Sequence, residues 1–165
     1  MDKYYYFVSQ LPMLKFNEKP VIGKDYFLDE AKKWLSLKDL ESVLGLNIND
    51  FISKKNDLNV LREYKYFERV LREELVLFRK SLYSNIDSKA LTVLDLSIME
   101  GNPLDVERKL LLLRWDFIEE KEQGHFFDLE LLCLYFLKLQ ILERLFIFDK
   151  EKGTLVFDKL CEVKS

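Results

Sequence analysis

The sequence has few of the residues that most metal centres and nucleophilic enzymes need. Its 165 residues include one histidine, two cysteines, five glycines and three prolines. A single histidine excludes zinc and iron sites built on two or more histidines. We interpret that histidine, His125, which follows Gly124, as a loop or helix-entry residue. Cys133 and Cys161 form neither a CxxC motif nor a disulfide framework, so we expect reduced thiols, with Cys133 packed inside an apolar helix.

The sequence also lacks the motifs of nucleotide binding and nucleophilic catalysis. It contains no GxxxxGK[ST] phosphate loop, no GxGxxG fingerprint and no GxSxG elbow. Neighbouring carboxylates such as Glu73 and Glu74, or Glu119 and Glu120, point about 100° apart on a helix and are therefore poor chelating pairs. We predict no catalytic residue, no cofactor and no metal site, and hence a protein that is not itself an enzyme.

An excess of basic residues is missing too. The chain has 26 Lys and Arg against 29 Asp and Glu, a net charge of -3, so no attraction to nucleic acid is expected. The N-terminus, MDKYYYFVSQLP, shows neither the basic region nor the apolar run of a secretory signal, so we expect none. The apolar segment 129–148 contains Glu130, Lys138 and Glu143, and a charge at the centre of a membrane helix costs about 2.5 to 3.5 kcal/mol. We therefore expect a core helix, a cytoplasmic location and no direct membrane insertion.

What the sequence does have is apolar residues at helical spacing. It is 48% hydrophobic and 14% aromatic, which favours an ordered chain. The glycines and prolines fall between the periodic segments, as helix boundaries do. The expected helices cover residues 24–35, 36–45, 59–83, 90–99, 103–123 and 129–148, with connectors at 47–56 and 85–88. Residues 4–8 and 146–157 fit a strand or a helix, and we favour helices. We predict an all-α, single-domain bundle of about six or seven helices over residues 1–165.

Several charged residues lie on or near apolar helix faces. They are Arg72, Arg79, Glu107, Arg114 and Glu143. An unpaired buried charge is costly, whereas a carboxylate facing a guanidinium satisfies both groups. We therefore predict that Glu143 or Glu107 pairs with Arg114, Arg79 or Arg72 across a helix interface. We interpret such a pair as structural, fixing the register of two helices, rather than as a functional site.

Three consecutive tyrosines, Tyr4, Tyr5 and Tyr6, stand near the start of the chain. Tyrosine is enriched among the residues that dominate binding at protein interfaces, so these side chains are candidates for contact with a partner. They are equally compatible with a place in the core. Both interpretations are open from the sequence.

Four segments together carry a resemblance that covers nearly the whole chain. They are YYYFVSQLPML at 4–14, FERVLREELVLFRKSLY at 67–83, NPLDVERKLLLLRWDFIEE at 102–120 and FDLELLCLYFLKLQILERLFIFDKEKG at 127–153. They resemble an uncharacterised protein family encoded within the V-type ATP synthase gene clusters of some bacteria. The shared features are packing patterns, so the resemblance supplies no functional residues.

In those gene clusters the family appears where a central-stalk C subunit, also called d, is expected. That subunit is an all-helical funnel of three lobes between the rotor shaft and the membrane ring, and this chain is too short for three lobes. The resemblance implies a non-catalytic subunit or an assembly or coupling factor of a V-type rotary ATPase. Its partners would be ATPase subunits, and its location would be peripheral to the inner membrane. The alternative is a freestanding cytoplasmic helical adaptor or a homo-oligomer unrelated to the ATPase.

Overall fold

The computed structural model describes residues 4–83, 91–147, 159 and 161. Within these residues the chain is helical and contains no strand, which confirms the predicted all-α class. The elements are α1 (Tyr5–Gln10), α2 (Lys24–Trp34), α3 (Leu37–Leu44), α4 (Asn59–Tyr83), the 3-10 helix η1 (Leu96–Met99), α5 (Pro103–Glu122) and α6 (Leu129–Ile147). No helix in this part of the chain is both long and apolar enough to cross a membrane.

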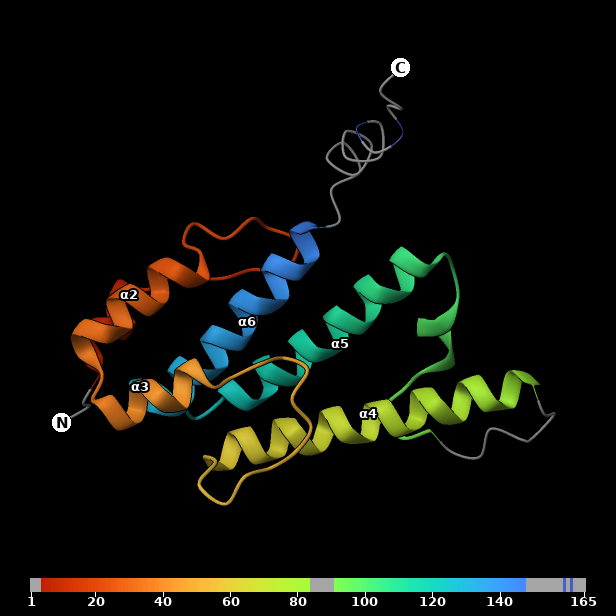
Figure 1. Cartoon of the computed structure of the whole chain (residues 1–165), viewed down its shortest axis with the longest axis horizontal. Coiled ribbons are helices and arrows are strands. Elements are labelled where there is room, and N and C mark those ends of the chain that lie inside the picture. Colours follow the sequence, from red (N-terminus) through yellow and green to blue (C-terminus); the bar gives the residue numbers. More distant parts are fainter. Residues whose placement is uncertain (1–3, 84–90, 148–158, 160, 162–165) are drawn as a thin grey trace.

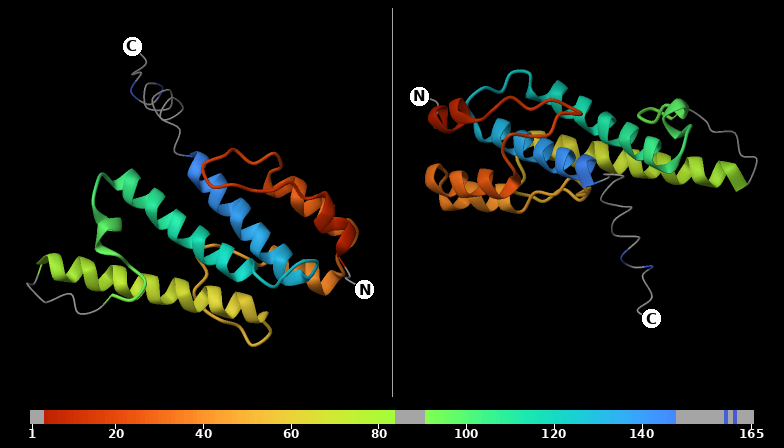
Figure 2. Two further views of the ribbon diagram at one scale, coloured as in Figure 1. Left: turned by 180° about the vertical axis from the view of Figure 1, so that it is seen from behind. Right: turned by 90° about the horizontal axis from the view of Figure 1, so that it is seen from above.

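Helix α6 is the centre of the bundle. Ten of its 19 residues are buried, because its sequence is apolar on nearly every side and a helix of that kind must be surrounded. Helices α4, α5, α6 and α2 lie side by side in that order, with α5 antiparallel to α6 (Figure 1). Viewed from above, α5 lies on one side of α6, and α2 and α3 lie on the other (Figure 2).

The predicted helix boundaries at α3 and α5 have the expected caps. The side chain of Ser36 accepts a hydrogen bond from the backbone N–H of Asp39 at 3.3 Å. Asn102 does the same for Asp105 at 2.9 Å, and proline occupies the first helical position, where its missing N–H costs nothing. These side-chain oxygens satisfy N–H groups that have no partner within the helix.

The buried side chains form two clusters of unequal size. The larger cluster surrounds α6 and includes residues of α1, α2 and α3, of the first turns of α4, and of the middle and last turns of α5. The smaller one is centred on Phe67, Leu71, Leu94 and Leu110, between α4, α5 and the segment before η1. Because the smaller cluster covers only part of the second half of α4, that half leaves apolar side chains exposed, among them Val76, Leu77, Leu82 and Tyr83.

The helix predicted over 90–99 is wrong. Only the η1 turn is helical within the described part of that segment. The backbone N–H groups of Thr92, Val93 and Leu94 donate to the carboxylate of Glu74 at 2.7, 3.0 and 2.7 Å, and the Thr92 hydroxyl donates at 2.6 Å. These hydrogen bonds direct the N–H groups of residues 92–94 toward Glu74, and residues 91–95 are not helical. Glu74 therefore holds this segment against α4.

The two chain ends differ in how far the structure tests them. The favoured helix near the N-terminus is confirmed as α1, whose Phe7 is buried against α2. Most of the segment 146–157 lies outside the described residues, and so does the connector predicted at 85–88. Phe146 and Ile147 belong to the last turn of α6.

Candidate partner-binding surface

Aromatic side chains from three parts of the chain meet at the end of the bundle where α1 begins. The ring of Tyr5 lies 5.7 Å from that of Tyr6 and 4.7 Å from that of Phe127, which precedes α6. Tyr6 stacks on Trp34, the last residue of α2, at 6.2 Å. Tyr5, Tyr6 and Trp34 are 50%, 67% and 43% exposed. We call these four residues the aromatic corner.

The three N-terminal tyrosines divide between core and surface. Tyr4 is buried, and its hydroxyl donates a hydrogen bond to the Asp39 carboxylate, so the structure does not place it toward a partner. Tyr4 and Phe7 are three residues apart and share the buried face of α1. Tyr5 and Tyr6 consequently face outward. Of the two interpretations open from the sequence, the core is correct for Tyr4, and an exposed position is correct for Tyr5 and Tyr6.

A second apolar surface lies in a groove of about 610 Å³ between α4, α5 and the segment before η1. Its lining residues are Arg62, Glu63, Tyr66, Phe67, Val70, Thr92, Val93, Phe117 and Lys121. The rings of Phe67 and Phe117 stack at 4.2 Å and form an aromatic floor. We call this the α4–α5 groove.

Charged residues rim the α4–α5 groove. Lys121 forms an ion pair with Glu63 at 2.9 Å, and its ammonium lies 5.3 Å from the centre of the Phe117 ring. The hydrogen bond to Glu63 raises the pKa of Lys121, which keeps the ammonium charged. On the outer side, Arg69 lies over the exposed ring of Tyr66 at 5.1 Å. An apolar floor with a charged rim is the usual anatomy of a protein interface.

Arg114 of α5 is buried and pairs with Glu68 of α4. The guanidinium Nε and Nη2 donate to the two carboxylate oxygens at 2.9 and 3.0 Å. Nη1 donates to the backbone carbonyl of Leu110 at 3.2 Å, and Arg72 adds a hydrogen bond to Glu68 at 3.0 Å. Burial lowers the pKa of Arg114, but the hydrogen bonds and charge of Glu68 outweigh it, so the pKa lies above its ordinary value. The pair fastens α4 to α5.

The partners predicted for Arg114 are wrong. Glu143 is only partly buried and pairs with Lys24 of α2 at 2.8 Å, while Glu107 pairs with Arg144 of α6 at 2.6 Å. Arg79 is exposed on α4. A helical wheel gives the face on which a charge lies, but not which neighbouring helix covers that face. The signal that could have identified the partner is that Glu68 alone interrupts the apolar stripe of residues 61–82.

Two buried lysines, Lys138 and Lys65, were not predicted from the sequence. Lys138 of α6 forms ion pairs with Glu122 at 2.5 Å and Glu119 at 3.5 Å, and its ammonium lies 4.8 Å from the Trp115 ring. On α4, Lys65 pairs with Asp57 at 2.8 Å beside a hollow of about 340 Å³ between α3 and the start of α4. Each of these pairs is satisfied where it lies.

Glu74 of α4 is a second buried carboxylate. Burial raises the pKa of Glu74. Hydrogen bonds from the Thr92 side chain and from the backbone N–H groups of residues 92–94 lower this pKa by a larger amount, so it lies below its ordinary value. The sequence alone does not show which of the two neighbouring residues, Glu73 or Glu74, is buried.

One known family is similar to part of the chain. A family model described as "Protein of unknown function (DUF2764)" matches residues 88–163. The match includes η1, α5 and α6 and leaves α1 to α4 outside it. No curated protein and no solved structure matches the chain. The chain is thus similar, over the part that contains its central helix, to a family without an assigned function.

Proposed function

We propose that this chain is a non-catalytic subunit, or an assembly or coupling factor, of a V-type rotary ATPase and acts through protein–protein contacts. The link to the ATPase is supported by the resemblance of the four sequence segments described above. The role in binding is carried by one observation, the exposed aromatic corner. Tyr and Trp offer a large contact area for few rotatable bonds, which is why they are enriched at interface hot spots.

The packing of the aromatic corner favours this role. Tyr5, Tyr6, Trp34 and Phe127 already contact one another in a connected row, so a partner would not have to order them one by one. Preorganised side chains lose less conformational entropy on binding, and that raises the affinity for a given contact area. The aromatic corner contains residues of α1, of α2 and of the loop before α6, so a partner bound there would contact three parts of the bundle at once.

The test is recovery of partners from the native host. The tagged chain is purified in mild detergent and the co-purifying proteins are quantified by mass spectrometry. We expect V-type ATPase subunits in amounts stoichiometric with the chain. Recovery of the chain without them would overturn the ATPase link, and a doubled mass in light scattering would then support the homo-oligomer.

Matched variants locate the binding surface. Tyr6→Ala combined with Trp34→Ala should reduce recovery of the subunits, since loss of a hot-spot residue costs about 2 kcal/mol or more, roughly thirty-fold in Kd. Tyr66→Ala tests the α4–α5 groove in the same way. Tyr83→Ala is the control, because this tyrosine is exposed at the far end of α4. Unchanged recovery with the double variant would show that the aromatic corner is not the contact.

A further inference from the structure

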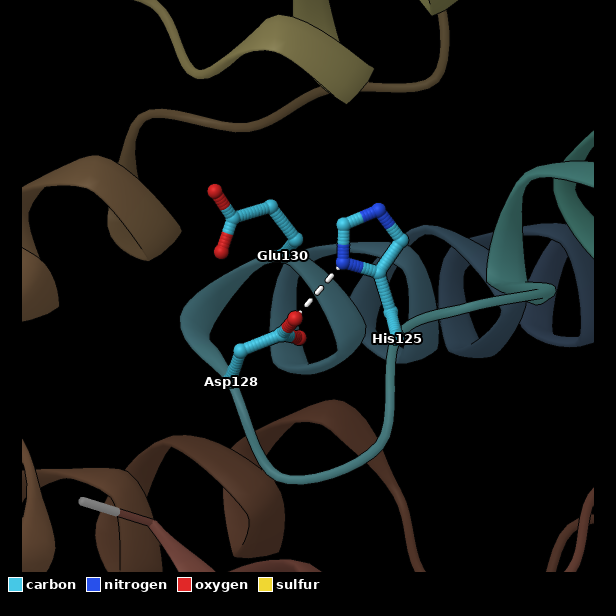
Figure 3. A group of neighbouring side chains, drawn as sticks. All are labelled: His125, Asp128 and Glu130. Atoms are coloured by element: carbon cyan, nitrogen blue, oxygen red, sulfur yellow. Dashed lines mark hydrogen bonds and ion pairs between the residues drawn. The ribbon is translucent and has the colours of Figure 1, made fainter. Parts of the chain in front are cut away.

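The connection between α5 and α6 folds back on itself and brings its polar side chains together. Helix α5 ends at Glu122, and the backbone N–H of His125 donates to the Glu122 carbonyl at 3.0 Å. Gly124 has a φ of 96°, a conformation that other residues rarely adopt, and it reverses the chain there. His125 consequently faces the start of α6, where its Nδ1 lies 2.6 Å from Oδ2 of Asp128 (Figure 3).

Asp128 uses its two oxygens for different purposes. Oδ1 accepts a hydrogen bond from the backbone N–H of Leu131 at 2.9 Å and so caps α6. Oδ2 is the oxygen that faces His125. The cap fixes the orientation of the carboxylate, as supporting hydrogen bonds commonly do for metal ligands, and leaves Oδ2 to a second group.

Glu130 completes a group of three. Its side chain lies beside those of His125 and Asp128 at the first turn of α6 (Figure 3). One ligand atom from each of the three residues lies within 4.8 Å of the other two. Within the described residues Glu130 makes no hydrogen bond or ion pair, and all three side chains are half-buried. Glu130 lies in the first turn of α6, where the helix dipole favours a carboxylate, and its charge has no ion-pair partner among the described residues.

We propose that His125, Asp128 and Glu130 form a binding site for one divalent transition-metal ion, with Zn²⁺ as the fitting example. An imidazole nitrogen with two carboxylate oxygens is a donor set that Zn²⁺ accepts, at about 2.0 to 2.2 Å, with water in the fourth position. Ligand atoms around such an ion lie about 3.4 Å apart. The His125 and Asp128 atoms would open slightly from 2.6 Å, and the Glu130 carboxylate would close in by a side-chain rotation.

The electrostatics of this turn favour a cation. The N-terminal end of a helix carries a partial positive charge of about half a unit, which opposes a bound cation, but the two carboxylates outweigh it. Burial raises the pKa of Cys133, one turn further along, to about 12, and the charges of Glu130, Asp39 and Asp128 raise it as well. Burial is the main cause of this increase, and the negative charges of Glu130 and Asp128, which contribute to it, would also attract a metal ion.

The site is independent of the proposed ATPase link, and the chain offers an unusually direct probe of it. The protein has one histidine, so after removal of any affinity tag its long-range ¹H–¹⁵N spectrum contains the signals of one imidazole. On addition of one equivalent of Zn²⁺ we expect these signals to shift and titration calorimetry to show one ion per chain. The experiment is done with the Cys161→Ser variant, because Cys161 is an exposed thiol that would itself bind Zn²⁺.

Three conservative variants separate a metal site from a simple helix cap. Asp128→Asn keeps a good capping residue but removes a charged ligand, Glu130→Gln keeps the shape of the side chain, and His125→Ala removes the nitrogen. Each should weaken Zn²⁺ binding at least about tenfold while the circular dichroism spectrum is unchanged. The exposed Glu100→Gln, near η1, should leave binding as it is.

Two outcomes would overturn the proposal. The first is Zn²⁺ binding that is absent, or that stays the same in Glu130→Gln and His125→Ala, which would leave only the His125–Asp128 cap. The second is displacement of Zn²⁺ by a moderate excess of Mg²⁺, since Mg²⁺ prefers oxygen ligands and its success would exclude a transition-metal site that uses the imidazole.

Discussion

Glu68 has no exposed surface, and both of its oxygens accept hydrogen bonds from arginines of two helices. Arg114 in turn has Glu68 and the Leu110 carbonyl as acceptors. Within the described residues no buried side-chain nitrogen or oxygen lacks a hydrogen-bond partner. The buried charged groups described here therefore all have hydrogen-bond partners, and removing one member of the Glu68–Arg114 pair should cost far more than the pair itself contributes.

We expect Glu68→Ala to destabilise the protein by about 3 to 5 kcal/mol, because it leaves the buried Arg114 guanidinium without a counter-charge. The measurement is the free energy of unfolding in urea. The matched control is Glu107→Ala, whose partner Arg144 is partly exposed, and which should cost about 1 kcal/mol or less. Similar losses in the two variants would mean that the Glu68–Arg114 pair is not buried as described.

We expect Glu74 to make the free energy of unfolding depend on pH in the acidic range. Its pKa in the folded protein is below the ordinary value of 4.5, so the unfolded chain takes up its proton first as the pH falls. The stabilisation is fully present above pH 4.5 and is lost as the pH falls through the folded-state pKa. Glu74→Gln should lower the melting temperature at pH 6 and reduce its fall between pH 6 and pH 3.

The control for this prediction is Glu73→Gln. Glu73 is the preceding residue on α4, and its side chain is 67% exposed, so its neutralisation should leave the acid dependence nearly intact. If the two variants gave the same profile, the hydrogen bonds from residues 92–94 to Glu74 would not be the source of the effect.

At the scale of the elements, α5 depends on how it starts. It carries Arg114 and Phe117, one of the two floor residues of the α4–α5 groove, and its first turn is capped by Asn102. We expect Asn102→Ala to lower the free energy of unfolding by about 1 kcal/mol, because one backbone N–H loses its acceptor. Asn102→Asp should restore stability, since aspartate caps equally well and its charge favours a helix N-terminus. A loss with aspartate as large as with alanine would contradict the capping role.

The elements also show what the sequence could and could not predict. Helices α2 to α6 were predicted close to their observed bounds, because glycine, proline and capping residues mark their ends and apolar spacing marks their faces. The segment before η1 was missed because its conformation is imposed by Glu74, about twenty residues away. Local sequence patterns cannot reveal a contact between residues so far apart in the chain.

The same limit applies to the candidate sites. The exposure of Tyr5 and Tyr6 follows from the register of α1 on α2, which the sequence left open. His125 was interpreted as a loop or helix-entry residue, and it lies in the loop before α6, but its approach to Asp128 and Glu130 depends on the reversal at Gly124. The spacing His125, Asp128 and Glu130 across a loop and a helix start matches no common metal motif, so only the three-dimensional arrangement brings it to notice.

At the scale of the whole molecule, the earliest and latest helices share one core. Phe27 of α2 stacks on Tyr135 and Phe136 of α6 at 5.6 and 5.4 Å, across more than one hundred residues of chain. The Gln140 side chain of α6 both donates to the carbonyl of Leu46 and accepts from the N–H of Ile48. The connector after α3 is therefore also held in place by the last described helix.

This arrangement has a consequence for how the protein is made. A ribosome synthesises α1, α2 and α3 well before α6, so Phe27 lacks its α6 partners, Tyr135 and Phe136, while α4 and α5 are being translated. Contacts between distant parts of a chain form late, and apolar surface exposed in the meantime invites aggregation. The nascent chain should thus depend on chaperones until α6 has left the exit tunnel, and only then can the bundle close around it.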